Sequence, residues 1–189
     1  MKKILFSITA VFLGFSSWAQ VELTPEEQAF QDSINVVNAA NAATAESQEA
    51  YNAGIALFGQ NKMKEAVASF DKAIAGDPKF EAAFYNKGVA QYKMKDYKGA
   101  VKTLSSLIKL NDENPKAYFQ RGLANQKLGN LEKAGADYDQ TTFFDPKDAK
   151  AFYNGGTVLF LKKEYDDAIK KFTRCLELKP KYFEAYNDR

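Results

Sequence analysis

The most constraining feature of this chain is a step of 34 residues that recurs in several independent columns. The glycines that keep it are Gly54, Gly88, Gly122 and Gly156, the alanines are Ala66, Ala100, Ala134 and Ala168, the large apolar residues are Phe70, Leu104, Tyr138 and Phe172, and the prolines are Pro78, Pro146 and Pro180, with Asp112 in the one gap. A period shared by several columns indicates one supersecondary unit copied four times. Such units stack in a row, so that each touches only its neighbours.

Each copy has the pattern of two amphipathic helices. In the copy at 81–114, apolar residues recur at spacings of three and four over 82–94 and again over 97–110, which predicts two helices. Lys95 and Asp96 form the polar turn between them, and Gly129 does the same in the third copy, where glycine suits a left-handed helix end. Proline after the second helix cannot continue it, so each copy closes there.

The repeated small residues predict close helix packing. A glycine inside a helix costs about 1 kcal/mol relative to alanine, so four at one position are explained if a neighbouring helix passes too close for a side chain. The alanine column of the second helix has the same interpretation. The large apolar column is expected to fill the wider space one turn later.

Together with an aromatic column at Phe84, Tyr118 and Phe152, this pattern resembles the tetratricopeptide repeat family over residues 47–182. The resemblance implies an all-α fold, a right-handed superhelical solenoid of four helix-turn-helix repeats, with an N-terminal helix and the start of a fifth repeat. The sequence departs from the family pattern just before each glycine, where leucine is usual. The residues found there are Ala53, Lys87, Arg121 and Gly155.

The first residues have the pattern of a secretory signal. Lys2 and Lys3 precede an apolar run at 4–15, and Ser17-Trp18-Ala19 offers small residues for cleavage after Ala19. The run has about 12 residues, whereas about 20 are needed to span a bilayer, so no integral membrane segment is expected after cleavage; an uncleaved anchor is the alternative. The protein is therefore expected to be exported, periplasmic or secreted.

The predicted organisation has seven parts. They are 1–19 signal peptide, 20–46 acidic N-terminal helix or linker, 47–80 repeat 1, 81–114 repeat 2, 115–148 repeat 3, 149–182 repeat 4, and 183–189 incomplete fifth repeat or cap. In the second part we expect one helix over about Pro25–Ala40, followed at 38–45 by a linker or weak helix. Whether this acidic segment folds back on the repeats or stays solvated is open.

The charge balance gives no sign of nucleic-acid binding. Without Lys2 and Lys3 the chain has 24 basic and 24 acidic residues, so the isoelectric point of the full sequence overstates how basic the mature protein is.

The C-terminal end predicts an open surface. Residues 183–187 align with the start of another copy, and the apolar face formed by Tyr165, Ile169, Phe172 and Leu176 is expected to be poorly covered. A solenoid normally closes with a polar cap. The alternatives are that a longer protein continues there, or that this end pairs with another surface, as in a homo-oligomer.

The composition argues against an enzyme. The chain has no histidine, which is the commonest general base and metal ligand, and a single cysteine, Cys175, which is expected to pack inward as a small apolar residue. We expect no cofactor and no metal. The pairs Asp166–Asp167 and Asp137–Asp139 are interpreted as solvated helix faces rather than calcium ligands.

The resemblance implies that the first helix of each repeat lines a concave groove. The predicted groove residues are Tyr51, Asn52, Tyr85, Asn86, Val89, Lys93, Lys116, Phe119, Gln120, Lys127, Lys150, Tyr153 and Asn154. Aromatic side chains, amides and lysines suit an extended or helical peptide with acidic groups. A scaffold face with no defined ligand is the alternative.

Some family members clamp a terminal carboxylate with two Lys, two Asn and one Arg. The corresponding positions here are Tyr51, Ile55, Asn86, Lys116 and Gln120. Only Asn86 and Lys116 match, so a dedicated clamp is not expected.

These observations predict a non-catalytic protein–protein interaction module, an adaptor, scaffold or assembly factor of the bacterial cell envelope, with a protein or peptide partner. The alternatives are an accessory repeat domain of a larger enzyme or secretion system, and a homo-oligomeric scaffold built through the uncapped C-terminal end.

Overall fold

The computed structural model describes residues 25–189, with the side chains of 32–35 and 44–189. The predicted signal peptide therefore lies outside the described residues. The chain divides into two compact units, Met1–Ala39 and Ala40–Arg189, and all four predicted repeats belong to the second.

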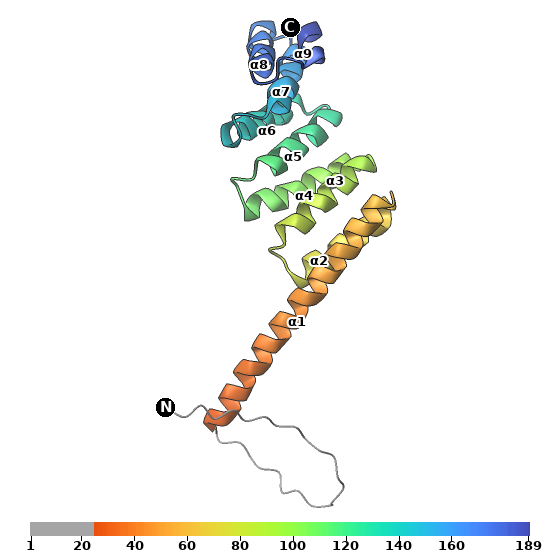
Figure 1. Cartoon of the computed structure of the whole chain (residues 1–189), viewed down its shortest axis with the longest axis vertical. Helices are drawn as coiled ribbons and strands as arrows, with labels where there is room; N and C mark the ends of the chain where they lie inside the picture. Colours follow the sequence, from red (N-terminus) through yellow and green to blue (C-terminus); the bar gives the residue numbers. More distant parts are fainter. Residues whose placement is uncertain (1–24) are drawn as a thin grey trace, which may run out of the picture. The chain divides into compact units, whose positions relative to one another are not determined.

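All regular structure over 25–189 is helical, which confirms the all-α prediction. The helices are α1 (Pro25–Gly59), α2 (Met63–Gly76), α3 (Glu81–Lys93), α4 (Tyr97–Leu110), α5 (Pro115–Lys127), α6 (Leu131–Phe144), α7 (Ala149–Leu161), α8 (Tyr165–Leu178) and α9 (Phe183–Asp188). From α2 onward, each helix packs against the next in sequence. Figure 1 shows these antiparallel pairs following one another as a solenoid.

Helix α1 is longer than the sequence predicted. It begins at Pro25 as expected, but it does not end near Ala40, and the stretch at 38–45 is helical rather than a linker. This stretch is rich in alanine, which has the highest helix propensity of all residues, so the backbone stays helical without an apolar stripe to indicate it.

The glycine column has the predicted steric cause. A Cβ atom added at Gly156 would lie 2.6 Å from the Phe172 ring, and one added at Gly88 would lie 2.7 Å from the Leu104 side chain. Gly54 and Gly122 meet Phe70 and Tyr138 in the same way. The large apolar residue, which follows the alanine of its own helix by one turn, therefore packs directly against the glycine of its own repeat.

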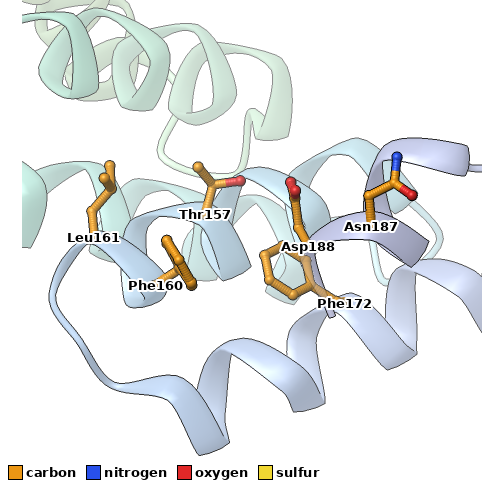
Figure 2. A pocket seen from close by; sticks show the side chains of 6 residues that line it. All are labelled: Thr157, Phe160, Leu161, Phe172, Asn187 and Asp188. Carbon is orange, nitrogen blue, oxygen red and sulfur yellow. The ribbon is translucent and has the colours of Figure 1, made fainter.

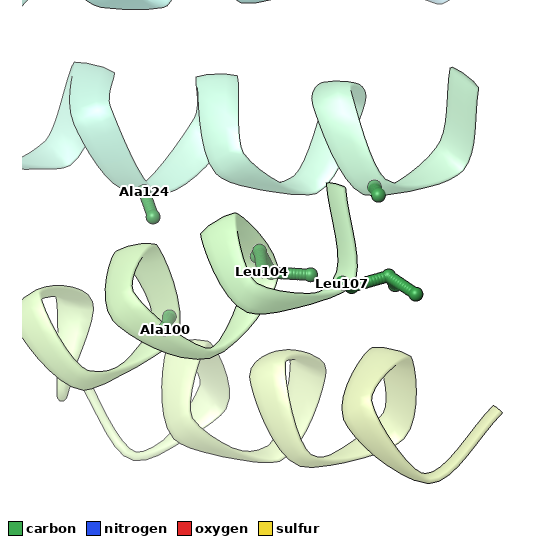
Figure 3. Close-up of a cluster of buried hydrophobic side chains, with 5 residues drawn as sticks. Ala100, Leu104, Leu107 and Ala124 are labelled. Carbon is green, nitrogen blue, oxygen red and sulfur yellow. The ribbon is translucent and has the colours of Figure 1, made fainter. Parts of the chain in front are cut away.

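The alanine column of the second helices is fully buried: Ala66, Ala100, Ala134 and Ala168 are 0% exposed. Between repeats 2 and 3, Ala100 and Leu104 of α4 form one cluster with Ala117 and Ala124 of α5 (Figure 3). Small residues on both sides let the helix backbones approach closely, while leucine fills the remaining space.

The turns inside the repeats share a left-handed residue. Asn61, Lys95, Gly129 and Lys163 have φ angles of 62°, 65°, 77° and 66°, and they too are 34 residues apart. Gly129 confirms the sequence prediction. A lysine in this conformation carries a steric cost of about 1–2 kcal/mol that glycine avoids.

The departure from the family pattern before the glycine column produces ion pairs. Arg121 on α5 binds Asp137 on α6 through N–H groups at 2.6 and 3.1 Å and also donates to Ser105 on α4. Asn125 donates to the same carboxylate at 2.9 Å. Asp137 is only 3% exposed, so its interpretation as part of a solvated face is wrong. Lys87 instead pairs with Asp71 on α2 of the preceding repeat, which is the direction in which Arg121 donates to Ser105.

The C-terminal face is covered in part. Ala185 of α9 packs on Cys175 and Leu176, which are 0% and 6% exposed, so the prediction of a buried cysteine is confirmed. Phe172 is also buried, which contradicts the expectation that this whole face is open. Tyr165 and Ile169 remain about half exposed, because α9 spans only six residues and covers less of the face than a complete helix does.

Candidate functional site

All predicted groove residues lie on the first helices of the repeats. Tyr51 and Asn52 are on α1, and the others are on α3, α5 and α7. The aromatic and amide side chains are half-buried, apart from the exposed Asn52, while the four predicted lysines are exposed. Helices α3 and α5 contact each other directly, although a second helix separates them in the chain. Side chains on these two helices can therefore act on one ligand.

Three predicted groove residues line one pocket. Tyr85 and Asn86 of α3 meet Lys116 of α5 there, together with Glu81, Ala82 and Asn114, around a volume of about 270 Å³. Lys116 is exposed and has no recorded ion pair within the described part of the chain. The carboxylate of Glu81, by contrast, accepts hydrogen bonds from Asn111 at 2.9 Å and Asn114 at 3.5 Å. The pocket therefore presents one exposed ammonium group, and the carboxylate beside it has its Oε2 engaged by two amides.

Asn86 is held in place by contacts within the chain. Its amide nitrogen donates to the Tyr51 hydroxyl at 3.0 Å and to the Ala82 carbonyl oxygen at 2.9 Å. Both amide protons are used, so the group left for a ligand is the side-chain carbonyl oxygen. Of the two residues that match the family's carboxylate clamp, Lys116 alone offers a free donor.

The aromatic positions of the first helices differ in what covers them. Tyr51 packs on Phe80 and Tyr153 packs on Tyr182, with ring centroids 4.8 and 5.0 Å apart. The positions of Phe80 and Tyr182 are taken by Asn114 and Asp148 in the two middle repeats, where both side chains cap helix N-termini instead. The pocket beside Tyr85 is open because Asn114 is smaller than an aromatic ring.

Tyr153 is tied to the last helix. Its hydroxyl donates to the Asp188 carboxylate at 2.8 Å. Burial, followed by this hydrogen bond and the nearby negative charge, raises the pKa of Tyr153 to about 12. The phenol is neutral at physiological pH and fixes α9 against α7.

The remaining predicted lysines frame these side chains. Lys93 lies over the Phe58 ring, 5.1 Å from its centroid, which is a cation–π contact. Lys127 and Lys150 are exposed and take part in no ion pair recorded among the described residues. Helices α5 and α7 contain no acidic residue, so Lys116, Lys127 and Lys150 make these two helices locally cationic.

A second pocket was not predicted from the sequence. It has a volume of about 350 Å³ and is lined by Thr157, Phe160, Leu161, Phe172, Asn187 and Asp188. Figure 2 shows that these side chains come from α7, α8 and α9 and that Phe160 and Phe172 face one another across it. One signal was present in the sequence: Leu161 stands where the two preceding repeats have Lys93 and Lys127.

Neither pocket is lined by a histidine or a cysteine. Over the described residues there is no cluster of His, Cys, Asp or Glu able to hold a metal ion. Burial raises the pKa of the Cys175 thiol, which favours the unreactive protonated form. No helix among the residues that the structure describes is long and apolar enough to cross a membrane.

Known proteins share both the sequence pattern and the fold. A TPR repeat model matches residues 54–95 and 92–129, and a tetratricopeptide repeat model matches 119–183. The solved structure of MamA 41-end from Desulfovibrio magneticus RS-1 is 29% identical, with a TM-score of 0.67 over 72% of this chain and 77% of that one.

Two further similarities concern chaperone-associated proteins. The first TPR of Spaghetti (RPAP3), solved with the HSP90 peptide SRMEEVD, is 24% identical, with a TM-score of 0.62 over 64% of this chain and 95% of that one, and this shows the fold alone. The Hsp70-Hsp90 organizing protein 1 of Glycine max is 36% identical over 58 residues. That match covers 31% of this chain and a tenth of the relative's length.

Repeats of this type form protein–protein interaction scaffolds. Because the family models span residues 54–183 and the helices stack in consecutive pairs, the chain belongs to the tetratricopeptide repeat family.

Proposed function

We propose that this protein is an exported interaction module of the bacterial cell envelope, which binds an acidic peptide segment of a partner protein along α3, α5 and α7. This role requires no catalytic residue. The first helices supply a binding surface, and the second helices hold them in register.

The pocket formed by Tyr85, Asn86 and Lys116 carries this proposal. It brings together an aromatic face, an amide oxygen and an exposed ammonium group from two different repeats, and the carboxylate of Glu81 on its rim is held by Asn111 and Asn114. The ring offers contact area, the amide oxygen accepts from a peptide N–H, and the ammonium attracts a carboxylate. Phe119 and the exposed Lys127 and Lys150 extend the same chemistry along α5 and α7.

The mode of binding differs from a terminal carboxylate clamp. The clamp positions on α1 hold Tyr51 and Ile55 rather than polar residues, and the amide protons of Asn86 are used inside the chain. Side-chain carboxylates anywhere along a peptide satisfy Lys116 and Lys150 as well as a chain end does. We therefore expect affinity to depend on acidic residues and to change little when the peptide C-terminus is amidated.

Selection from a displayed peptide library tests the proposal. Selected sequences are expected to be enriched in Asp and Glu, and their affinity, measured by calorimetry, should fall at least about tenfold in the variant Tyr85→Ala/Phe119→Ala, which loses two aromatic contacts. Circular dichroism should show unchanged helicity. A library that yields no specific ligand, or ligands unaffected by the double change, would contradict the proposal.

Export is tested separately. The pattern Lys2-Lys3, apolar run and Ser17-Trp18-Ala19 supports cleavage after Ala19. Intact mass of the protein recovered from the producing bacterium should correspond to a chain that begins at Gln20, in the extracytoplasmic fraction. Recovery of the intact N-terminus from the cytoplasmic fraction would reject the envelope location while leaving peptide binding untouched.

A further inference from the structure

The pocket between α7, α8 and α9 is chemically unlike the one between α3 and α5. Its floor is the buried ring of Phe172, and its walls include Phe160 and Leu161, which are 51% and 52% exposed. None of its lining residues is a cation (Figure 2). Two exposed apolar side chains around a buried ring form a surface suited to an apolar group.

The apolar character is specific to repeat 4. Leu161 is at the position that Lys93 occupies on α3 and Lys127 on α5. An exposed leucine side chain forms no hydrogen bonds with water, whereas the ammonium groups of the lysines at the same position do. The face of the first helices is therefore cationic along α5 and apolar at the end of α7.

The equivalent ring in repeat 1 shows what such a position accepts. Phe58, three repeats before Phe160, is half-buried beneath the side chain of Lys93, which the next first helix supplies. Phe160 contacts Tyr165 edge to face, with centroids 5.5 Å apart, and half of its surface stays exposed. The ring can thus be covered by a group that contacts it from the pocket.

The rim of the pocket selects the kind of group. Asp188 accepts from Tyr153 through one carboxylate oxygen, which leaves the other as an acceptor, and the hydroxyl oxygen of Thr157, whose proton goes to the Tyr153 carbonyl, also accepts. An acidic side chain is repelled by Asp188. An aromatic ring with an N–H donor fits both the apolar walls and the acceptors of the rim.

We infer that this pocket is a subsite for one large aromatic side chain, of tryptophan type, in the same peptide whose acidic residues lie against α3 and α5. The inference rests on the proposed function and adds the second specificity element of the ligand. A volume of about 350 Å³ lies at the lower end of the range of about 300 to 1,000 Å³ for ligand pockets, so it has room for one large side chain.

The probe is the peptide Glu-Glu-Glu-Gly-Ser-Gly-Ser-Trp, together with its reversed sequence, since the direction of binding is not assumed. The matched peptides carry Ser in place of Trp. The protein is the full chain with Trp18→Phe, so that the only indole is that of the peptide. We expect the better-binding Trp peptide to bind about tenfold more tightly than its Ser counterpart, with indole emission shifted to the blue on binding.

Two leucine-to-lysine variants separate the pocket from general surface effects. Leu161→Lys restores the residue type found on α3 and α5, and it should remove both the affinity gain and the emission shift. Leu110→Lys, at a leucine 43% exposed on α4, should leave both unchanged.

The outcomes distinguish the two proposals. Equal binding of Trp and Ser peptides, or an unshifted emission, overturns the subsite and leaves the acidic groove standing. Absence of binding by every peptide removes the groove and the subsite together. A blue shift that survives Leu161→Lys places the indole elsewhere and also overturns the inference.

Discussion

The interior of the helix pairs and the face of the first helices follow different rules in this molecule. Inside, the same contact recurs in every repeat, glycine against a large apolar side chain, as in Gly54–Phe70 and Gly156–Phe172. On the face of α3, α5 and α7, one position changes from Lys93 and Lys127 to Leu161. The interior is fixed by steric fit, whereas residues on the face differ from one repeat to the next, so the proposed differences in binding between repeats lie on this face.

The largest expected effect comes from the buried ion pair. Arg121→Met leaves Asp137, whose side chain is 4% exposed, without its charged partner, and it should lower the free energy of unfolding by about 3 kcal/mol. Lys127→Met, an exposed lysine on the same helix, should change stability by less than about 0.5 kcal/mol. Urea denaturation of both variants measures the difference.

If Lys127→Met is as destabilising as Arg121→Met, the expected difference between a buried ion pair and an exposed lysine is wrong. Replacing the pair together, as Arg121→Met/Asp137→Leu, should recover most of the loss, because no buried charge is then left unpaired.

The glycine contacts give the next largest effect. Gly156→Ala places a methyl group 2.6 Å from the Phe172 ring, which is 1% exposed and cannot move away freely, so a loss of about 1–3 kcal/mol is expected. The neighbouring Gly155→Ala meets its nearest atom at 3.7 Å and should be neutral or stabilising by up to about 1 kcal/mol. The melting temperature should fall in Gly156→Ala and stay the same or rise in Gly155→Ala. An equal fall in both variants would mean that steric fit does not explain the glycine column.

The turns give a smaller effect. Lys163→Gly removes the cost of a side chain at a φ of 66° and should raise the free energy of unfolding by about 0.5–1 kcal/mol. Gly129→Ala, at a φ of 77°, should lower it by a similar amount. If both changes shift the melting temperature in the same direction, the left-handed backbone conformation does not explain the stability of these turns.

The smallest effect concerns pH. Tyr153 has a folded pKa of about 12 against an ordinary value of 10.0, so its contribution to stability is complete below pH 10 and is lost as the pH rises toward 12. Tyr153→Phe cannot ionise and should show a smaller loss of melting temperature over this interval. Equal losses in both proteins would indicate that the Asp188 contact does not hold α9.

The sequence predicted the repeats well, because packing imposes the same small and large residues every 34 positions. The helices from α2 to α8 follow from those columns. Tyr85, Asn86 and Lys116 of the predicted groove line one pocket, and peptide binding there stays a prediction. The same steric contact, glycine against a large apolar side chain, recurs in each copy, so the helix pairing found in one repeat holds for all four.

The parts that could not be predicted depend on contacts outside the period. Asp137 is spaced like a surface acid, and its burial is decided by Arg121 from another helix. The second pocket needs Asn187 and Asp188 of α9, and although 183–187 align with the start of another copy, that alignment did not show which side chains α9 brings to α7 and α8. The length of α1 had no apolar signal, since alanine is helical without one.

The most direct test of peptide binding by the first helices uses a library-selected peptide that carries a nitroxide spin label, with assigned amide resonances of the protein. We predict paramagnetic broadening along α3, α5 and α7, strongest around Tyr85 and Lys116, with little on the outward face of α4, α6 and α8. Broadening confined to α4, α6 and α8 would contradict the account.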